Sequence, residues 1–217
     1  MKAYQIKIEL KDSSPSIWRR VIIPADVTFK RLHDTIQFAM DWQDYHLYEF
    51  DIPQEQLRIT NDEEAYEQFK YYSTKFKSKE LPKAKDKREF ISRVLERTIR
   101  KPQSVKIDKY LETYKELEYV YDFGDYWRHR VTFENVLEDY PYGYPQIIDG
   151  EGACPPEDVG GIGGYANFLE AWSDAQHPDH EAMRSWGEVQ RYREFNIHEK
   201  NDLFKCCLKL KKTTRGQ

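Results

Sequence analysis

The sequence has 217 residues, of which 39% are hydrophobic, 33% charged and 15% aromatic, and its formal net charge is −4. The aromatic content argues against a disordered chain, and the length suffices for one well-cored domain. No stretch approaches the roughly 18 apolar residues of a membrane-spanning helix, and the charged, alternating N-terminus lacks the apolar segment of a signal peptide. These features argue against a membrane-embedded or secreted protein.

Hydrophobic periodicity predicts strand, strand, helix and strand at the start of the chain. Period-two alternation marks strands at 3–10 and 16–24, and the turn-forming stretch between them predicts an antiparallel hairpin. Thr28 can cap a helix over 29–42, where apolar residues recur at helical spacing. A third alternating stretch covers 46–52. This order predicts a β-grasp-like start to an α+β domain.

A charged, helical stretch at about 62–109 interrupts the strand-forming sequence. Helices are predicted over 61–72, which begins with an Asn cap, and over 86–100, where apolar residues share one face. Residues 70–109 hold 14 basic residues against 5 acidic ones, whereas the whole chain has 34 against 38. We interpret the stretch as a basic helical insertion into a single domain over 1–217.

The charge of this insertion has two interpretations. Clustered lysine and arginine side chains can bind the phosphates of nucleic acid. Alternatively, they keep an exposed helical pair in solution. The residues that a nucleic-acid-binding accessory protein would use are Lys83, Lys85, Lys87, Arg88, Arg93, Arg97, Arg100 and Lys101.

The second half of the chain begins with strands and ends with helices. Strands are predicted at 117–123 and 127–138, joined by a turn in which Gly124 can adopt a positive φ. The Gly- and Pro-rich stretch 140–164 is expected to be irregular, either as a functional loop or as a packed surface loop. Helical patterns follow at 165–175, 178–188 and 198–211. The overall prediction is an α+β fold with a mixed or antiparallel sheet and C-terminal helices.

Two motif matches in this half are weak. Asp122-Phe123-Gly124 is the tripeptide that holds magnesium in protein kinases, but the Gly-rich loop, strand lysine and His-Arg-Asp motif of a kinase do not accompany it. The stretch Gly161–Ala166 formally fits the dinucleotide fingerprint, yet no strand–helix–strand pattern surrounds it. We therefore expect no cofactor. The glycines before a helix can still receive an anion.

Acidic residues and one histidine stand in two segments of this half: Asp122, Asp125, His129, Glu157 and Asp158. If they converge, they can bind a hard cation or perform acid–base chemistry, as in a metal-dependent hydrolase. Alternatively, the two aspartates near 124 accept hydrogen bonds from turn amides, and the pair at 157–158 braces the glycine loop. The sequence leaves both interpretations open.

The cysteines and the remaining histidines give no metal motif. Cys154, Cys206 and Cys207 are odd in number and lack framework spacing, which is typical of a reducing cytoplasm, where we expect the protein. His177 and His180 straddle a predicted helix start and have no third ligand at a fixed spacing. We therefore assign no metal ligands from these residues.

Several segments together, in chain order, resemble the plasmid pRiA4b ORF-3-like family. They are Ile17–Val21, Leu32-His33, Trp42, His46-Leu47, Tyr121–Asp125, Trp127, His129, Gly152–Asp158, Gly160-Gly161, Gly164-Tyr165, His177–Glu181 and Trp186. The resemblance covers most of the chain apart from the basic insertion. It implies a protein found on plasmids and chromosomes, in some cases labelled a transposon passenger, without an established activity. Val159 stands where many members have a second cysteine, which argues against a shared metal or disulfide at Cys154.

The leading hypothesis is a binding or interaction module associated with mobile genetic elements, and the sequence leaves open whether it is an enzyme. We expect its site in the groove between the turn 122–129 and the loop 157–165. The expected ligand is a small polar molecule, a peptide or a loop of a protein partner. The candidate ligand-binding residues are Asp122, Asp125, Trp127, His129, Glu157, Asp158, Gly161 and Tyr165.

Overall fold

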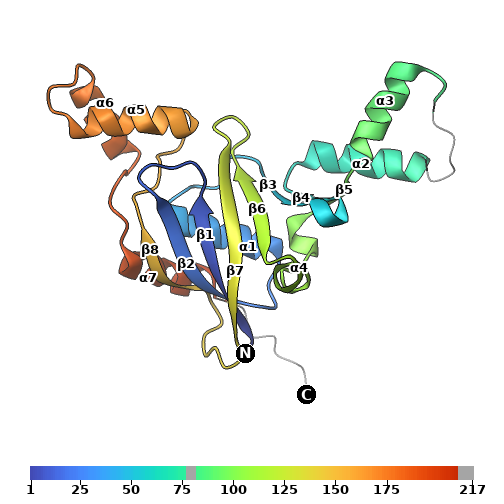
Figure 1. The fold of residues 1–217 in the computed structure, drawn as a ribbon, viewed down its shortest axis with the longest axis horizontal. Helices are drawn as coiled ribbons and strands as arrows, with labels where there is room; N and C mark the ends of the chain where they lie inside the picture. Colours follow the sequence, from blue (N-terminus) through green and yellow to red (C-terminus); the bar gives the residue numbers. More distant parts are fainter. Residues whose placement is uncertain (77–81, 210–217) are drawn as a thin grey trace.

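The computed structural model describes residues 1–76 and 82–209 (Figure 1). Eight strands form one sheet in the order β5-β4-β3-β6-β7-β1-β2-β8. The strands are β1 (Ala3–Leu10), β2 (Ile17–Pro24), β3 (Tyr48–Ile52), β4 (Leu57–Thr60), β5 (Thr98–Arg100), β6 (Glu116–Tyr121), β7 (Trp127–Leu137) and β8 (Gln146–Glu151). Neighbouring strands are antiparallel except β4 and β5, which are parallel. The sheet is therefore mixed, and the predicted α+β class is confirmed.

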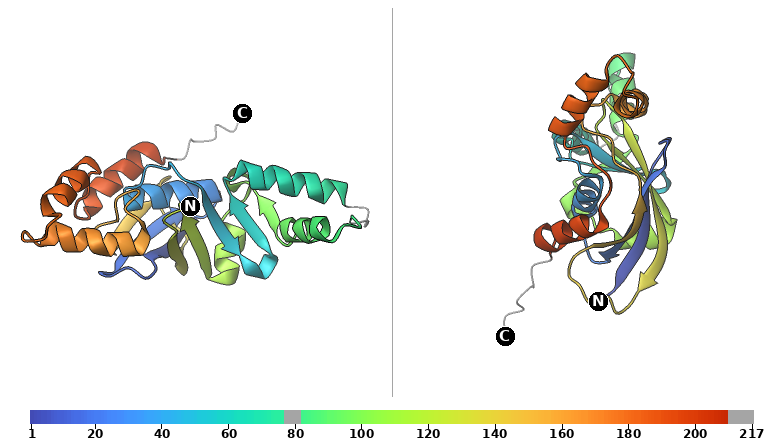
Figure 2. Two further views of the ribbon diagram at one scale, coloured as in Figure 1. Left: turned by 90° about the horizontal axis from the view of Figure 1, so that it is seen from above. Right: turned by 90° about the vertical axis from the view of Figure 1, so that its left-hand side faces the viewer.

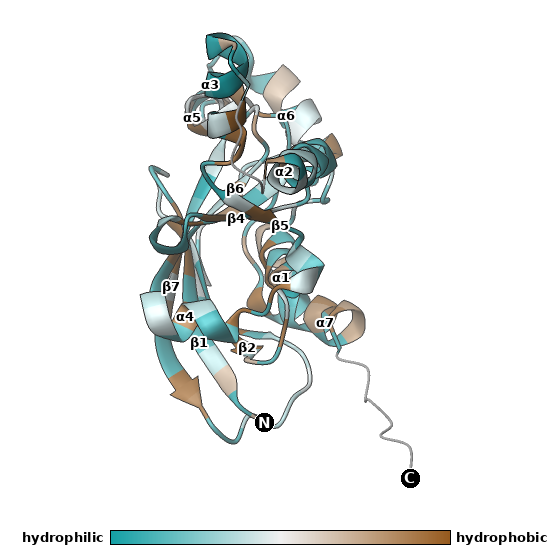
Figure 3. Cartoon of the chain, turned by 90° about the vertical axis from the view of Figure 1, so that its right-hand side faces the viewer, coloured by the Kyte–Doolittle hydropathy of each residue, from teal (hydrophilic) through white to brown (hydrophobic). Residues whose placement is uncertain are grey.

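The helices pack on one face of the sheet and at its two ends. They are α1 (Phe29–Met40), α2 (Glu63–Lys75), α3 (Lys85–Val94), α4 (Asp108–Tyr114), α5 (Gly161–Ser173), α6 (His180–Val189) and α7 (Ile197–Cys207). Helices α1 and α7 lie on the same side of the strands (Figures 2 and 3). Helices α2 and α3 project at one end of the sheet, and α5 and α6 lie at the other (Figure 1). Among the described residues, none of these helices combines the length and apolarity that crossing a membrane requires.

The central strand β1 shows why one face of the sheet is covered. Its side chains alternate between fully buried and half-buried positions, as the period of two requires when only one face packs on helices. Helix α1 supplies the opposite half of the core with Phe29, Leu32 and Ile36, none of which is exposed. The predicted cap is present, because the Thr28 hydroxyl oxygen accepts a hydrogen bond from the Arg31 amide at 3.4 Å.

The predicted helix over 86–100 is wrong in its second half. Helix α3 ends at Val94, and β5 pairs with β4 so that Ile99 is buried at the edge of the sheet. Strands of three and four residues are too short to show a period, which is why β4 and β5 were not predicted. The short helix α4 was not predicted either.

The stretch at 62–109 consists of a projecting part and an integrated part. Helices α2 and α3 contact each other through aromatic rings, with Tyr72 edge-on to Phe90 at 5.8 Å between ring centroids. Farther along, Val105 and Ile107 are buried in the main core, and the Ile107 amide donates to the Val27 carbonyl at 3.0 Å. Only the helical pair therefore projects from the sheet. The wider insertion over 62–109 stays a prediction.

The irregular stretch predicted over 140–164 contains an edge strand. Strand β8 pairs antiparallel with β2, and α5 begins at Gly161 rather than at 165. Helix α7 ends at Cys207, before the predicted end at 211. The residues 210–217, including the predicted frayed tail, lie outside the described part of the chain.

Candidate functional site

The turn between β6 and β7 carries the first acidic side chain of the site. The Asp122 carboxylate accepts a hydrogen bond from the Gly124 amide at 2.8 Å. Positive φ values fall on Asp122 and Tyr126, at 55° and 58°, and not on Gly124. The prediction that Gly124 supplies the left-handed backbone is therefore wrong. An aspartate tolerates this conformation because its side chain closes a turn onto the amide two residues ahead.

Three carboxylates converge on the imidazole of His46. Its Nε2 lies 3.8 Å from Asp122 Oδ2, 3.5 Å from Glu157 Oε2 and 3.4 Å from Asp158 Oδ1. Asp122 and Glu157 are buried, whereas the Asp158 side chain is 69% exposed. The three acids come from the β6–β7 turn and from the loop after β8, and His46 comes from the segment between α1 and β3. This His46 cluster therefore joins three segments that are distant in sequence.

Glu157 is the most strongly held acid of the His46 cluster. Its Oε1 accepts hydrogen bonds from the Gln43 amide at 2.8 Å and from the Tyr121 hydroxyl at 3.1 Å. Burial raises the pKa of Glu157 above its ordinary value, although both hydrogen bonds favour the ionised form. A buried carboxyl in this position takes up either a proton or a cation readily.

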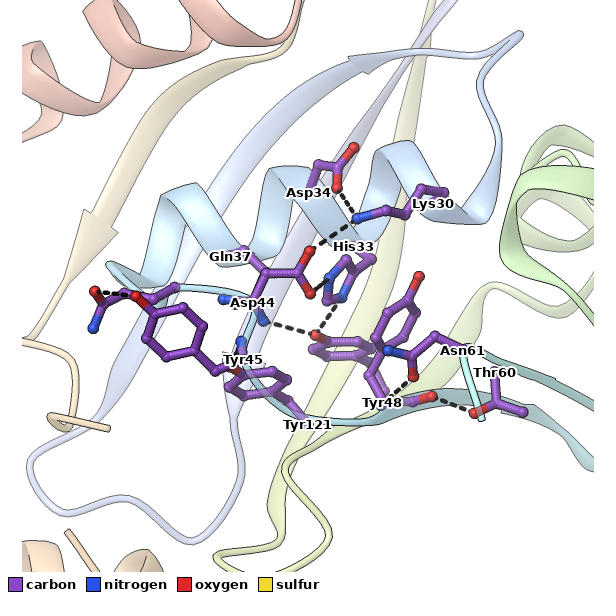
Figure 4. A network of polar contacts seen from close by, with 12 residues as sticks. Lys30, His33, Asp34, Gln37, Asp44, Tyr45, Tyr48, Thr60, Asn61 and Tyr121 are labelled. Carbon is purple, nitrogen blue, oxygen red and sulfur yellow. Dashed lines mark hydrogen bonds and ion pairs between the residues drawn. The ribbon is translucent and has the colours of Figure 1, made fainter. Parts of the chain in front are cut away.

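A polar network holds the segment that carries His46 (Figure 4). Asp44 accepts a hydrogen bond from His33 Nε2 at 2.7 Å, and the Asp44 amide donates to the side-chain oxygen of Gln37 at 2.9 Å. The other ring nitrogen of His33 accepts from the Tyr119 hydroxyl at 2.8 Å. Burial lowers the pKa of His33, and the Asp44 carboxylate, which accepts at Nε2, sets the tautomer of the neutral ring. The network anchors the backbone two residues before His46.

Nε2 of His46 is itself a buried nitrogen without a hydrogen bond inside the described ranges, 1–76 and 82–209. Buried polar atoms are normally paired, so such an atom needs an explanation. Oxygen and nitrogen ligands held at about 2.0–2.2 Å by one tetrahedral zinc ion are roughly 3.3–3.6 Å apart. The separations around His46 are close to this range, and ligand atoms of His46, Asp122 and Asp158 all lie within 4.8 Å of one another. The arrangement fits a cation with mixed nitrogen and oxygen ligands.

A second group of similar composition, His33 with Asp34 and Asp44, differs because a lysine already occupies it. The Lys30 ammonium donates to Asp34 at 2.6 Å and to Asp44 at 3.0 Å. Although partial burial opposes ionisation of Asp44, the hydrogen bonds from His33 and Lys30 hold its pKa at about 2. The Lys30 ammonium therefore already supplies the positive charge that balances these two carboxylates.

The predicted turn and glycine loop do lie side by side. Asp125 Oδ2 accepts from the Gly160 amide at 3.0 Å. Gly161 has a φ of 68°, and a Cβ at this position would stand 2.7 Å from the Asp125 carbonyl oxygen. Asp125 therefore fixes the glycine loop, and its carboxylate is not among the groups around His46.

Three other candidate residues lie in the core. Trp127 and His129 have no exposed surface, and Tyr165 is 2% exposed. His129 Nδ1 lies 3.1 Å from the Trp127 carbonyl oxygen, and burial lowers the pKa of His129 to about 3. The Tyr165 hydroxyl donates to the Ala153 carbonyl at 2.9 Å. These side chains are part of the core beneath the site. The histidine that meets the carboxylates is His46, and not His129 as the sequence had suggested.

His46 was missed because no local pattern marks it. The only signal was the match of Trp42 and His46-Leu47 to the family, which assigned no role. In the structure Trp42 stacks on Tyr121 with 4.9 Å between ring centroids, and the ring of His46 lies edge-on to the same tyrosine at 5.7 Å. The spacing of these two residues thus reflects packing on one tyrosine of β6.

Some of the basic candidate residues form ion pairs within the described residues, and the others are exposed side chains. Arg97 is paired with Asp51, and the Lys101 ammonium donates to Glu63 at 2.9 Å. Lys85 lies 3.9 Å from Glu89. The remaining candidates are exposed and are Lys83, Lys87, Arg88, Arg93 and Arg100. They lie on or near α3, at the end of the sheet opposite α5 and α6 (Figure 1).

The histidines and the cysteine considered as zinc ligands make other contacts. His177 Nδ1 accepts from the Asp179 amide, and His180 Nδ1 lies 2.8 Å from the Ala171 carbonyl oxygen. Cys154 Sγ lies 3.2 Å from Arg19 Nη2, and burial raises the pKa of its thiol. These residues do not form a metal cluster within the described part of the chain.

Comparisons with known proteins agree with the resemblance in the sequence. Residues 2–201 match the family described as plasmid pRiA4b ORF-3-like protein. The chain is 29% identical over 182 residues to the uncharacterized protein y4hQ of Sinorhizobium fredii, covering 84% of this chain and 79% of that protein. It is also similar to the crystal structure of MM3350, a protein of unknown function from Methanosarcina mazei, with a TM-score of 0.66 and 30% identity over 91% of this chain and 97% of the other. The chain therefore belongs to the plasmid pRiA4b ORF-3-like family.

Proposed function

We propose that the protein is a binding module whose site holds a divalent metal cation between His46, Asp122 and Asp158, with Glu157 beside them. The observation that supports this most is the buried Nε2 of His46, which has no hydrogen bond within the described residues and is surrounded by three carboxylates at 3.4–3.8 Å. An imidazole with carboxylates is a common ligand set for zinc and manganese in proteins.

Charge balance favours a metal over a simple ion pair. His46 can supply at most one positive charge, whereas the three acids can together carry up to three negative ones. Two of these acids are buried, where unbalanced charge is costly. A divalent cation would offset the excess of negative charge and bond to His46 Nε2, which has no hydrogen bond within the described residues.

Isothermal titration of the apo protein with Zn²⁺, Mn²⁺ and Mg²⁺ tests the proposal. We expect binding of Zn²⁺ or Mn²⁺ in preference to Mg²⁺, because the ligand set includes an imidazole. His46→Ala removes one direct ligand and is expected to weaken binding more than about tenfold, since even outer-sphere partners are worth 10–100-fold. The matched control is His198→Ala, which removes an exposed histidine on α7. Equal affinities of the two variants, or no binding by the parent protein, would refute the proposal.

Metal-dependent hydrolysis is a second candidate activity of the same site. The exposed side of Asp158 leaves one flank of the His46 cluster open to water, and a bound metal can lower the pKa of such a water. The assay is hydrolysis of p-nitrophenyl phosphate and p-nitrophenyl acetate by zinc- and manganese-loaded protein, with His46→Ala as the negative control. A protein that binds metal with no turnover above that variant would be a binding module only.

Nucleic-acid binding through α3 remains an alternative, supported by the exposed charge of Lys87, Arg88 and Arg93 on a projecting helix. Fluorescence anisotropy with duplex DNA at low salt measures it, and affinity should fall steeply as salt is raised. Lys87→Gln with Arg88→Gln should abolish binding, whereas Lys115→Gln with Arg130→Gln should not. Failure of the parent protein to bind would remove this alternative.

Two further expectations stay predictions. The family resemblance alone supports an association with mobile genetic elements, and the cysteine usage alone supports a cytoplasmic location. Conserved gene neighbours and cell fractionation, respectively, would test them.

A further inference from the structure

A groove at one end of the molecule has a composition unlike that of the His46 cluster. It has a volume of about 590 Å³, within the range of about 300–1,000 Å³ that small-molecule sites occupy. Helices α5 and α6 and the loop after β8 line it. Figure 1 shows this helical pair standing clear of the central strands.

The floor of the groove is apolar and aromatic. Phe168 of α5 is 2% exposed, and its ring lies edge-on to Trp186 of α6 at 5.6 Å between centroids. Trp186 and Met183 are only partly buried, so they present apolar surface to the groove. Helices α5 and α6 are held closely together, because a Cβ on Gly187 would stand 2.5 Å from the ring of Trp172.

The rim of the groove is acidic. Asp158, Glu170 and Asp179 line it and are exposed, and no lysine or arginine is among the lining residues. Within the described part of the chain, Glu170 and Asp179 have no ion-pair partner. The nearby cation of α6, Arg184, lies over the ring of Trp172 at 4.0 Å.

We infer that this groove binds a small organic ammonium ion with an apolar body. The apolar and aromatic floor attracts the apolar body, and the partly exposed ring of Trp186 can attract a positive charge. The acidic rim supplies charge complementarity and disfavours anions. The inference does not rest on the metal site, because only Asp158 is shared between the two. Glu170, Asp179 and the two rings carry it.

Isothermal titration with phenethylamine and with its trimethylammonium analogue tests the inference, against 2-phenylethanol and phenylacetate as neutral and anionic isosteres. Titrations are carried out in EDTA, so that an unoccupied metal site does not affect the result. We expect both ammonium compounds to bind more tightly than the alcohol, and phenylacetate to bind least. Absence of binding by either ammonium compound, or equal affinity for the alcohol, would overturn the inference.

A double variant tests whether the rim supplies the selectivity. Glu170→Gln with Asp179→Gln should weaken ammonium binding roughly 2–30-fold, the effect of two exposed ion pairs, and leave the affinity for the alcohol unchanged. Glu181→Gln with Glu188→Gln makes the same change in net charge on exposed residues of α6 that do not line the groove. If this control weakens binding as much, the attraction is general electrostatics and the groove is not the site.

Discussion

The buried imidazole of His129 should make the protein less stable as the pH falls. The ring has no exposed surface, and burial lowers its pKa to about 3, against about 6.5 in an unfolded chain. Below pH 6.5 the unfolded state therefore binds a proton that the folded state does not. Stability from this residue is complete above pH 6.5 and is lost as the pH falls towards 3.

The expected loss of unfolding free energy between pH 8 and pH 5 is about 2 kcal/mol. At pH 5 the solution is about 1.5 units below the pKa of the unfolded state, and each unit corresponds to about 1.36 kcal/mol. His129→Phe replaces the ring by one that does not titrate. The variant can differ from the parent in stability at pH 8, since the contact with the Trp127 carbonyl is lost. Its dependence on pH should nevertheless be shallower by the stated amount.

Urea unfolding followed by tryptophan fluorescence at pH 8, 7, 6 and 5 measures this difference. The control His198→Gln removes an exposed histidine and should leave the pH dependence of the parent unchanged. Parallel stability curves for the parent and His129→Phe would refute the reasoning, because they would mean that the imidazole is protonated in the folded core or is not enclosed by it.

Two further pairs of variants test the packing around the sites. Gly163→Ala should stabilise α5 by about 0.5–1 kcal/mol, because a Cβ there meets no atom within 4 Å. Gly164→Ala should destabilise the protein by more than about 1 kcal/mol, because a Cβ would stand 1.9 Å from the Val159 carbonyl oxygen. Thermal unfolding distinguishes the two variants, and equal effects on stability would contradict the close approach of Gly164 to Val159. The buried Lys200 ammonium is hydrogen-bonded to Asp41, so Asp41→Asn should cost on the order of 3 kcal/mol by leaving the charge unpaired. Lys200→Met, which keeps the volume, should cost less than about 1.5 kcal/mol, and the reverse order in chemical denaturation would show that the ammonium reaches solvent.

Long elements with a clear period were predictable. The alternation in 3–10 and 16–24 and the capped amphipathic pattern from Thr28 correspond to β1, β2 and α1. In each of them burial on one face recurs often enough for local sequence to identify the element. Strands of three or four residues, such as β5, are too short to show such a repeat. In the sequence, Ile99 fits a continuation of the α3 helix as well as it fits a strand, and only the pairing of β5 with β4 in the structure distinguishes the two.

Some residues of the candidate site were likewise predictable from the sequence and others were not. Sequence pattern directed attention to the Asp122 turn and to the Glu157-Asp158 pair, because carboxylates that converge with a histidine can bind a cation or perform acid–base chemistry. It selected His129 and missed His46. Both have similar polar and aromatic neighbours in sequence, and only the packing decides that one faces the core and the other faces three carboxylates.

The sequence by itself therefore determined the α+β class and the family, and it named Asp122, Glu157 and Asp158 as candidates, since these inferences need only periodicity and residue types in chain order. The tertiary structure alone decided that His46, and not His129, meets those acids. It also decided that the acidic and aromatic residues of α5 and α6 line one groove. The physical reason is that convergence depends on strand order and helix packing, which bring together segments more than 70 residues apart and leave no local trace in the chain.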